Sequence, residues 1–429
     1  MSLDQLYAQT VKADNKTPQI KEKEKTLLTV TNPIDLSATV SMESAHQLFS
    51  DSANQKEQRL MVALPLELKL KEVIGRDWGE VYAQGIFIKE DSAVLNGQSM
   101  INDYHVYSNL KAEDRVQLFE VYWSKTWAQT TLRLGKLDAN DHFAVSEHES
   151  ALINGAAGYS PSIFGMPSYP DSAWSIQFAQ EFQRIELSIA VFDGGSTTLS
   201  PTPTGAHFGF SKGVSSGDLF YIAQITAHLG QFEEMTDNEI TKLLTSQQDR
   251  DLKTKSPFHV TLGIWTHRGD VVPTFGDEIT VNEQDHLELG EEQIPLGEPS
   301  SGIFLTSDLK LMSLARGGEL GLGVQMAVSS YYHPLHLSAA LTWSEIFSPI
   351  AWSEQGLSLA LGFSHLTITN HLIHLNDQRG NNENLFELTT CLPLTPSLLT
   401  SLSWVTLHGQ HLEEDFSHLL VVRVLLGIL

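Results

Sequence analysis

Alternation of apolar and polar residues is the feature that most constrains how this chain can fold. Between Arg59 and Lys71 every second residue is apolar, and these residues are Leu60, Val62, Leu64, Leu66, Leu68 and Leu70. Successive side chains of a β-strand point to opposite faces, whereas a helix would scatter the same residues around its circumference. The segment is therefore predicted to be a strand with one apolar face.

The same alternation recurs along most of the chain. It predicts strands at about 59–71, 78–89, 115–124, 128–137, 173–181, 185–193, 218–229, 257–267, 301–313, 318–329, 335–345, 356–367, 384–393, 398–408 and 417–428. A sixteenth strand is expected at either 34–43 or 205–212, and both of these patterns are weaker.

These predicted strands have the length and polarity of membrane-crossing strands. Most span roughly 9–12 residues, which matches a tilted crossing of the hydrocarbon layer, whereas soluble strands average about half that length. The face opposite the apolar one carries Gly, Ser, Thr, Gln and His, as a water-filled lumen requires. We therefore expect an all-β, transmembrane antiparallel β-barrel of about sixteen strands, because single-chain bacterial barrels have even strand numbers.

Composition excludes several other classes of protein. Asp and Glu number 52 against 27 Lys and Arg, a formal net charge of −25, so no nucleic-acid partner is expected. Cys391 is the single cysteine, which excludes a disulfide framework. No apolar run approaches the roughly 18 residues of a membrane helix. Residues 1–25 contain no apolar segment, so no signal peptide is expected within this chain.

The connections between the predicted strands differ in length. Short turns are expected at 125–127, 182–184 and 313–317, and long loops at 90–114, 138–172, 230–256 and 268–300. Short turns at one end and long loops at the other are typical of outer-membrane barrels. A loop of roughly 35 residues without structure of its own is usually functional or disordered, and we expect 138–172 to fold inward as a constriction loop. Residues 1–58 are predicted to be a polar N-terminal periplasmic segment, a short helix or strand at most, and 59–429 the barrel.

A block of sequence from Leu132 to Pro170 resembles the carbohydrate-selective outer-membrane porins of the OprB family. There a strand ends in Gly-Lys-Leu/Met-Asp, a Phe and an Asn follow within the loop, and Tyr-Pro leads into the next strand. The matching residues in this chain are Gly135, Lys136, Leu137, Asp138, Phe143, Asn154, Tyr169 and Pro170. Weaker similarity continues at 187–195, 260–269, 301–312 and 318–328.

The resemblance implies a porin in the bacterial outer membrane, without enzymatic activity and without a cofactor. It implies passive diffusion of small solutes, carbohydrates such as monosaccharides among them, through a water-filled barrel. The implied partners are outer-membrane lipid and lipopolysaccharide, sugar solutes and the barrel assembly machinery. The protein would be a monomer or a homotrimer.

Strand parity gives candidate solute-contacting residues. A constriction works through charged and aromatic side chains that replace part of a solute's hydration. If Phe119, Val121 and Trp123 face lipid, then Glu120 and Tyr122 face the lumen. The same rule places these residues on the lumen face: Thr131, Arg133, Glu67, Lys69, Trp265, His267 and Arg423. Lys136 and Asp138 join this set at the start of the constriction loop.

Simpler roles exist for several of these residues. Glu120 and Arg133 could form a structural ion pair across neighbouring strands, and Trp265 could lie in an aromatic belt at the membrane boundary. His371 and His374 form the one close histidine pair, but they fall in an expected loop, so no metal site is expected. No hydrolase, metalloprotease or phosphate-loop motif is present.

Three alternatives to a sugar porin remain open on the sequence. The barrel could be a non-selective or ion channel, it could act through its loops as an adhesin or scaffold, or the chain could be a soluble all-β enzyme or lectin.

Overall fold

The chain is seen in a computed structural model. It describes residues 34–48, 56–74, 76–92, 107–110, 112, 114–158, 160–163, 165–194, 219–229, 258–268, 280–281, 286–289, 292–295, 299–313, 318–330, 334–344, 356–367, 382–395, 397–409 and 416–428.

Strands dominate these residues. The elements are β1 (Ile34–Leu36), β2 (Ala38–Leu48), β3 (Lys56–Lys69), α2 (Leu70–Ile74), β4 (Glu80–Ser92), β5 (Arg115–Trp127), β6 (Thr130–Leu137), η1 (Ala139–Asp141), η2 (Glu149–Ala151), α3 (Gly155–Gly158), β7 (Ala173–Glu181), β8 (Ile185–Asp193), β9 (Leu219–Leu229), β10 (Phe258–Arg268), β11 (Thr280–Val281), β12 (His286–Leu289), β13 (Glu292–Pro295), β14 (Ser300–Ser313), β15 (Glu319–Ser329), β16 (Leu335–Trp343), β17 (Ser358–Thr367), β18 (Asn382–Thr395), β19 (Leu398–Gly409) and β20 (Phe416–Ile428).

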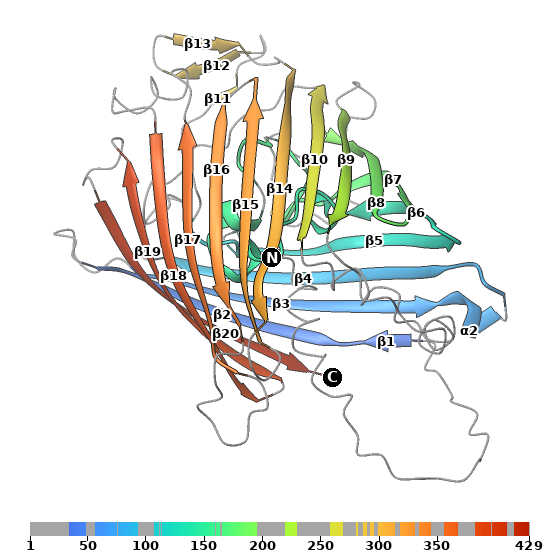
Figure 1. Ribbon diagram of the computed structural model, residues 1–429, viewed down its shortest axis with the longest axis horizontal. Helices are drawn as coiled ribbons and strands as arrows, with labels where there is room; N and C mark the ends of the chain where they lie inside the picture. The colour runs from blue at the N-terminus through green and yellow to red at the C-terminus, as the bar shows by residue number, and fades with distance from the viewer. Residues whose placement is uncertain are drawn as a thin grey trace.

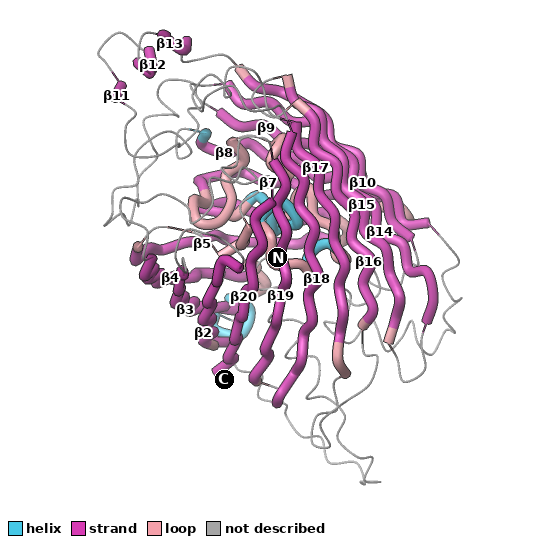
Figure 2. The backbone as a smooth tube through the Cα atoms, turned by 90° about the vertical axis from the view of Figure 1, so that its left-hand side faces the viewer, coloured by secondary structure: helices cyan, strands magenta, loops and turns pink. Residues whose placement is uncertain are grey.

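Sixteen of the strands close into one antiparallel barrel, which confirms the predicted fold. Strands β2 to β10 and β14 to β20 pair in chain order, and β20 pairs back onto β2. Strands on opposite walls cross in the side view of Figure 1, as the tilt of a closed barrel requires. Figure 2 shows the same backbone turned by 90°. Strands β11, β12 and β13 form a separate small sheet.

The barrel begins earlier in the chain than the alternation indicated. Strands β1 and β2 both pair with β3, so the alternative at 34–43 supplies the sixteenth strand. The other alternative, 205–212, lies outside the described residues. The expected boundary between residues 58 and 59 is therefore wrong, because β2 already belongs to the barrel. Ser44 and His46 occupy its outward positions and weaken the apolar pattern there.

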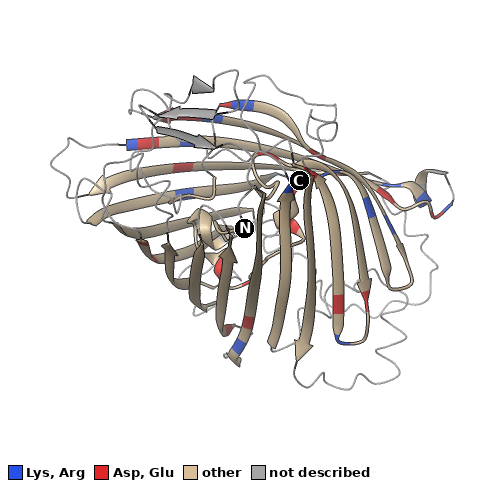
Figure 3. Cartoon of the chain, turned by 90° about the horizontal axis from the view of Figure 1, so that it is seen from above, with Lys and Arg blue, Asp and Glu red and all other residues tan. Residues whose placement is uncertain are grey.

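Exposure of the side chains follows the predicted parity. On β7 and β10, Ile176 and Ile264 are 60% and 59% exposed, whereas the adjacent Gln177 and Trp265 are 2% and 3% exposed. Long stretches of the strands carry no charged residue in the view from above (Figure 3). The apolar rows thus face outward, and the polar rows face the interior of the barrel.

A β-bulge reverses the parity expected for one residue. Gln84 pairs with Glu120 and Gly85 with Leu118, so Phe119 has no partner of its own and the register shifts there. Phe119 consequently points inward, where it is 4% exposed and packs with Met61, Ile86 and Ile88. The expectation that Phe119 faces lipid is wrong, because a bulge adds one residue to the period of two.

Successive connections alternate between the two ends of the barrel. The end that carries the turns after β5, β7 and β18 is called the turn end, and the opposite end, with 138–172, is called the loop end. The predicted asymmetry in length holds only in part, because the long connection 230–257 joins β9 to β10 at the turn end. No helix among the described residues is long and apolar enough to cross a membrane.

Candidate functional site

The connection 138–172 lies inside the barrel, as expected for a constriction loop. It starts at Asp138, whose backbone N–H donates to Glu120 at 2.8 Å. The Asp138 carboxylate in turn accepts the backbone N–H groups of Asn140 at 2.8 Å and Tyr169 at 3.2 Å. A single buried carboxylate thus joins the first and last turns of the loop.

Wall side chains then bind the loop backbone along its course. Asp308 on β14 accepts the Ser146 hydroxyl and the His148 backbone N–H, both at 2.9 Å. Gln224 on β9 accepts from the Ala144 N–H at 3.1 Å, and Gln325 on β15 donates to the Ala144 carbonyl at 3.3 Å. Backbone polar groups buried away from water need such partners. The inner face of the barrel therefore replaces the secondary structure that the loop lacks.

Glu387 on β18 holds the middle of the loop. Its carboxylate accepts the backbone N–H of Ile153 at 2.6 Å and that of Asn154 at 3.1 Å. The Asn154 side-chain amide adds a third bond at 2.7 Å, while its carbonyl oxygen accepts the Ala157 N–H at 2.9 Å. Hydrogen bonds to a charged group each contribute about 1.5–3 kcal/mol, so Glu387 is a strong anchor.

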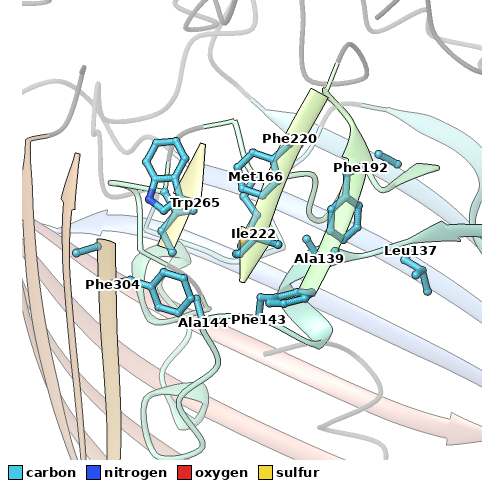
Figure 4. Packing of buried hydrophobic residues seen from close by; sticks show 14 residues of the cluster. Leu137, Ala139, Phe143, Ala144, Met166, Phe192, Phe220, Ile222, Trp265 and Phe304 are labelled. Carbon is cyan, nitrogen blue, oxygen red and sulfur yellow. The ribbon is translucent and has the colours of Figure 1, made fainter. Parts of the chain in front are cut away.

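Apolar packing fixes the loop from several sides. Phe143, Ile163 and Met166 of the loop pack in one cluster with Phe192, Phe220, Trp265 and Phe304 of the wall (Figure 4). Ile153 packs with Leu385, Val405, Leu419 and other residues of β2 and β18 to β20. Leu152 and Ala157 pack on Ala340 and Ala360. The loop thus touches walls around the circumference and narrows the barrel.

Glycines on the inner wall make room for the loop. A Cβ atom on Gly321 would lie 1.9 Å from the His148 ring, and one on Gly362 would lie 2.2 Å from the Leu152 side chain. At Gly323 the nearest atom, the Ser146 hydroxyl oxygen, would be 2.7 Å away. Strands β15 and β17 therefore accommodate the loop only because these positions lack side chains.

A second inward segment, residues 107–110 together with Ala112, lies beside the loop. The Asn109 N–H donates to the Ile153 carbonyl at 2.7 Å, and the Tyr169 hydroxyl donates to the Leu110 carbonyl at 3.3 Å. The two segments are thus bonded to each other as well as to the wall.

Buried charges attach this second segment to β2, β3 and β20. Arg59 binds Glu43 at 2.8 Å, Glu90 at 3.0 Å and the Tyr107 hydroxyl at 2.8 Å, and it also binds Glu57. Burial raises the pKa of Tyr107, so its hydroxyl stays protonated and donates to Glu57.

Comparison with known proteins agrees with this architecture. The sequence model of the OprB family, described as carbohydrate-selective porin, matches residues 53–284. The chain belongs to the OprB family. It is therefore a β-barrel channel for solute diffusion in a family of carbohydrate-selective porins.

Solved structures share the fold of this OprB-family chain at low sequence identity. The high-pH structure of Pseudomonas putida OprB has a TM-score of 0.69 and 12% identity, with 92% of this chain and 94% of that chain covered. The trimer form of in-vitro folded OmpT, an outer-membrane protein of Vibrio cholerae, has a TM-score of 0.51 and 8% identity, covering 92% and 100%. No curated protein sequence matches the chain significantly.

Some predicted solute-contacting residues of this porin lie together on the inner wall. The ring of Tyr122 packs against that of Tyr82 at a tilt of 31°, with centroids 5.1 Å apart, and Arg133 on β6 donates to Gln177 on β7 at 3.5 Å. Nearer the turn end of β3, Lys69 and Glu67 lie 3.9 Å apart and are about a third exposed. These side chains belong to the half of the wall next to the turn end, where the inner residues of β3 to β6 are less buried.

Other predicted residues lie inside the barrel but are covered. Trp265 is 3% exposed and stacks on Phe220, so the alternative of a membrane-belt position for it is wrong. His267 is fully buried and contacts the Gly194 carbonyl at 3.2 Å. Arg423 binds Glu43 at 2.6 Å, and Glu120 supports Asp138.

The family-motif residues have structural roles at the two ends of the loop. Gly135 adopts φ +148°, and a Cβ atom there would lie 2.2 Å from the Val121 carbonyl oxygen. Lys136 donates to the Leu118 carbonyl at 2.9 Å, next to the bulge at Phe119. The Tyr169–Pro170 peptide is cis, and the Pro170 carbonyl accepts Gln117.

Sequence reasoning missed most of the wall residues that hold the loop. Their shared signal is a polar side chain at an inward position of a strand, and they are Gln224, Asp308, Gln325, Ser338 and Glu387. Parity alone assigns such residues to a water-filled lumen. It shows that a side chain points inward, but not whether water or a buried loop lies next to it. Across the part of the chain that is described, no group of three or more His, Cys, Asp or Glu side chains could hold a metal ion.

Proposed function

We propose that this porin conducts small carbohydrates, chiefly monosaccharides, along the inner wall of β3 to β7. Two observations support the proposal: membership of a carbohydrate-selective family, and an inner loop fixed by wall side chains on several sides. The loop leaves the turn-end half of β3 to β6 as the less buried part of the inner wall.

The wall residues have the chemistry that a sugar requires. Arg133, held by the buried Gln177, offers hydrogen-bond donors for hydroxyl groups, and Glu67 with Lys69 presents opposite charges. The Tyr82–Tyr122 pair offers aromatic surface for the apolar face of a sugar ring. We assign solute contact to Arg133, Glu67, Lys69, Tyr82 and Tyr122, and we assign loop support to Glu120, Lys136, Asp138, Trp265, His267 and Arg423.

Conductance in planar bilayers tests the assignment. The protein should form discrete channels whose current falls when glucose is added, and a larger oligosaccharide should block less at equal concentration. Arg133→Ala should raise the half-blocking glucose concentration roughly tenfold, the loss of about 1.4 kcal/mol of binding. Arg268→Ala is the matched control, because Arg268 lies on the outer face against Tyr221. Absence of channels at every voltage would contradict the proposal.

We propose further that the outer face is embedded in outer-membrane lipid with lipopolysaccharide at the loop end, after insertion by the barrel assembly machinery. Mass measurement of the protein in gentle detergent would separate a monomer from a homotrimer.

A further inference from the structure

Glu149 is a buried acid on which no cation acts among the described residues. It lies in η2, within the inward loop, and is 0% exposed. One carboxyl oxygen, Oε2, accepts the Ser338 hydroxyl from β16 at 2.7 Å. The other oxygen, Oε1, is buried and meets no hydrogen-bond partner in the part of the chain that the structure describes. A carboxylate is expensive to bury in this way, whereas a protonated carboxyl is not.

The surroundings of Glu149 add negative rather than positive charge. Asp308 from β14 is the nearest charged wall residue to act on it, and Asp308 is itself bonded to His259 of β10 at 3.1 Å. On the loop, burial raises the pKa of the Glu147 carboxyl, which also interacts with His259 and Asp308, and His148 bonds Thr342 of β16 at 2.8 Å. The facing strand β15 contributes Gly321, Gly323 and Gln325, none of which titrates.

We propose that Glu149 is a proton-binding site that couples docking of the inward loop to pH. In the docked loop Glu149 holds its proton. When the O–H bond breaks and the proton passes to water, the remaining buried carboxylate is repelled by the charge of Asp308 and weakens the contact of η2 with β16. Loop docking is independent of the proposed sugar path, whereas the consequence for solute passage rests on the proposed function.

The direction of the effect follows from the pKa of Glu149 in the two states. Burial raises this pKa to about 8, and in an undocked, hydrated loop the pKa returns to its ordinary value of about 4.3. Below the ordinary value both states are protonated, and docking has no ionisation cost. Between the two values docking requires uptake of a proton, so its equilibrium constant falls about tenfold per pH unit. Above about pH 8 the loss is complete.

Hydrogen exchange of the full-length protein in detergent micelles tests the coupling. The readout is the protection factor of loop amides that depend on the docked state, those of His148, Ile153 and Asn154. Between pH 5.5 and pH 8.5 these protection factors should fall by about a hundredfold or more. In Glu149→Gln, which imitates the protonated acid, they should stay high and independent of pH.

Two further variants separate a proton switch from a general structural role. Ser338→Ala removes a donor that favours the charged form, so the pKa of docked Glu149 should rise and the loss of protection should continue to a higher pH before it levels off. Glu147→Gln removes the neighbouring loop acid, whose pKa burial also raises; if Glu149 is the switch, the pH profile of the wild type should remain in this variant. An unchanged profile in Glu149→Gln, or a flat profile in Glu147→Gln alone, would overturn the proposal.

Single-channel recording then tests the consequence for transport. Open-channel current of the wild type should become noisier and larger as pH rises through the same range, and that of Glu149→Gln should not. A protein whose loop protection is pH-dependent but which never conducts would refute the proposed function and leave the proton site standing.

Discussion

Gly135 joins a membrane-crossing strand to the inward loop at a position that tolerates no side chain. Its φ of +148° is a conformation that L-residues rarely adopt, and the Val121 carbonyl oxygen lies where a Cβ atom would be. The two constraints act together, since neither the backbone of β5 nor that of β6 can move without breaking the ladder between them.

Substitution at Gly135 should therefore destabilise the barrel. Gly135→Ala should cost at least about 1–3 kcal/mol, because backbone strain of this kind carries such values. The temperature at which the barrel loses its compact gel mobility measures the effect. Gly85→Ala is the matched control, because a Cβ atom on Gly85 meets nothing within 4 Å. Equal melting of the two variants would contradict this account.

For single residues, strand parity predicts which face a side chain points to better than it predicts what that side chain contacts. Tyr122, Arg133 and Trp265 all point inward, as the alternation indicated. Phe119 does not follow the rule, because the bulge opposite Gln84 and Gly85 is set by pairing with a neighbouring strand and leaves no mark in the local pattern. Burial of Trp265 likewise depends on Phe143 and Met166, which are distant in sequence.

Among the elements, the inward loop depends on wall carboxylates more than on its own structure. Its described helices span only three or four residues each. A polar group on the wall that binds backbone N–H groups can therefore decide whether the loop stays in place.

Weakening the Glu387 anchor should loosen the loop without unfolding the barrel. Glu387→Gln removes the charge that Ile153 and Asn154 share, at a cost of about 1.5–3 kcal/mol. Single-channel current should then fluctuate between more than one level. Glu186→Gln, at the turn end of β8, should behave as the wild type. A quiet current in Glu387→Gln would show that apolar packing alone holds the loop.

Removal of the loop tests whether it narrows the channel. A protein in which residues 139–170 are replaced by a short Gly-Ser linker should conduct several-fold more current and should lose block by glucose. Its stability should fall as well, because the apolar cluster around Phe192 and Phe220 loses its partners. An adhesin would instead lose partner binding and gain no conductance.

For the whole molecule, buried charges stabilise the seam where the first and last barrel strands meet. Glu43 on β2 lies between Arg423 on β20 and Arg59 on β3, and all three are at most 6% exposed. Loss of Arg423 would leave Arg59 alone to balance Glu43, Glu57 and Glu90, so the group would hold an excess of negative charge.

Removing one charge at the seam should therefore destabilise the barrel more than removing two opposite charges together. Arg423→Met should destabilise the barrel by about 3–5 kcal/mol, while the double variant Glu43→Gln/Arg423→Met should recover part of this loss. Denaturant unfolding in detergent, followed by tryptophan fluorescence, measures both. A double variant less stable than Arg423→Met would point to packing rather than charge as the cause.

Most of the barrel could be predicted because lipid imposes one simple rule on every second residue. The rule is weakest at β2, where Ser44 and His46 face outward, so the alternation of apolar residues predicts a start of the barrel that is too late in the chain. The loop anchors could not be predicted, since Glu387 and Asp308 lie far from Ile153 and His148 in sequence and meet them only once the barrel has closed.

The pairing of β2 with β20 places Ala38 beside Ile428. The paired strands form a closed ring, although the chain itself is linear. A rearranged gene that starts at β15, ends at β14 and joins the present ends through a short linker would give every strand the same two neighbours. The order in which the strands are synthesised is thus free to change, while the set of neighbours is not.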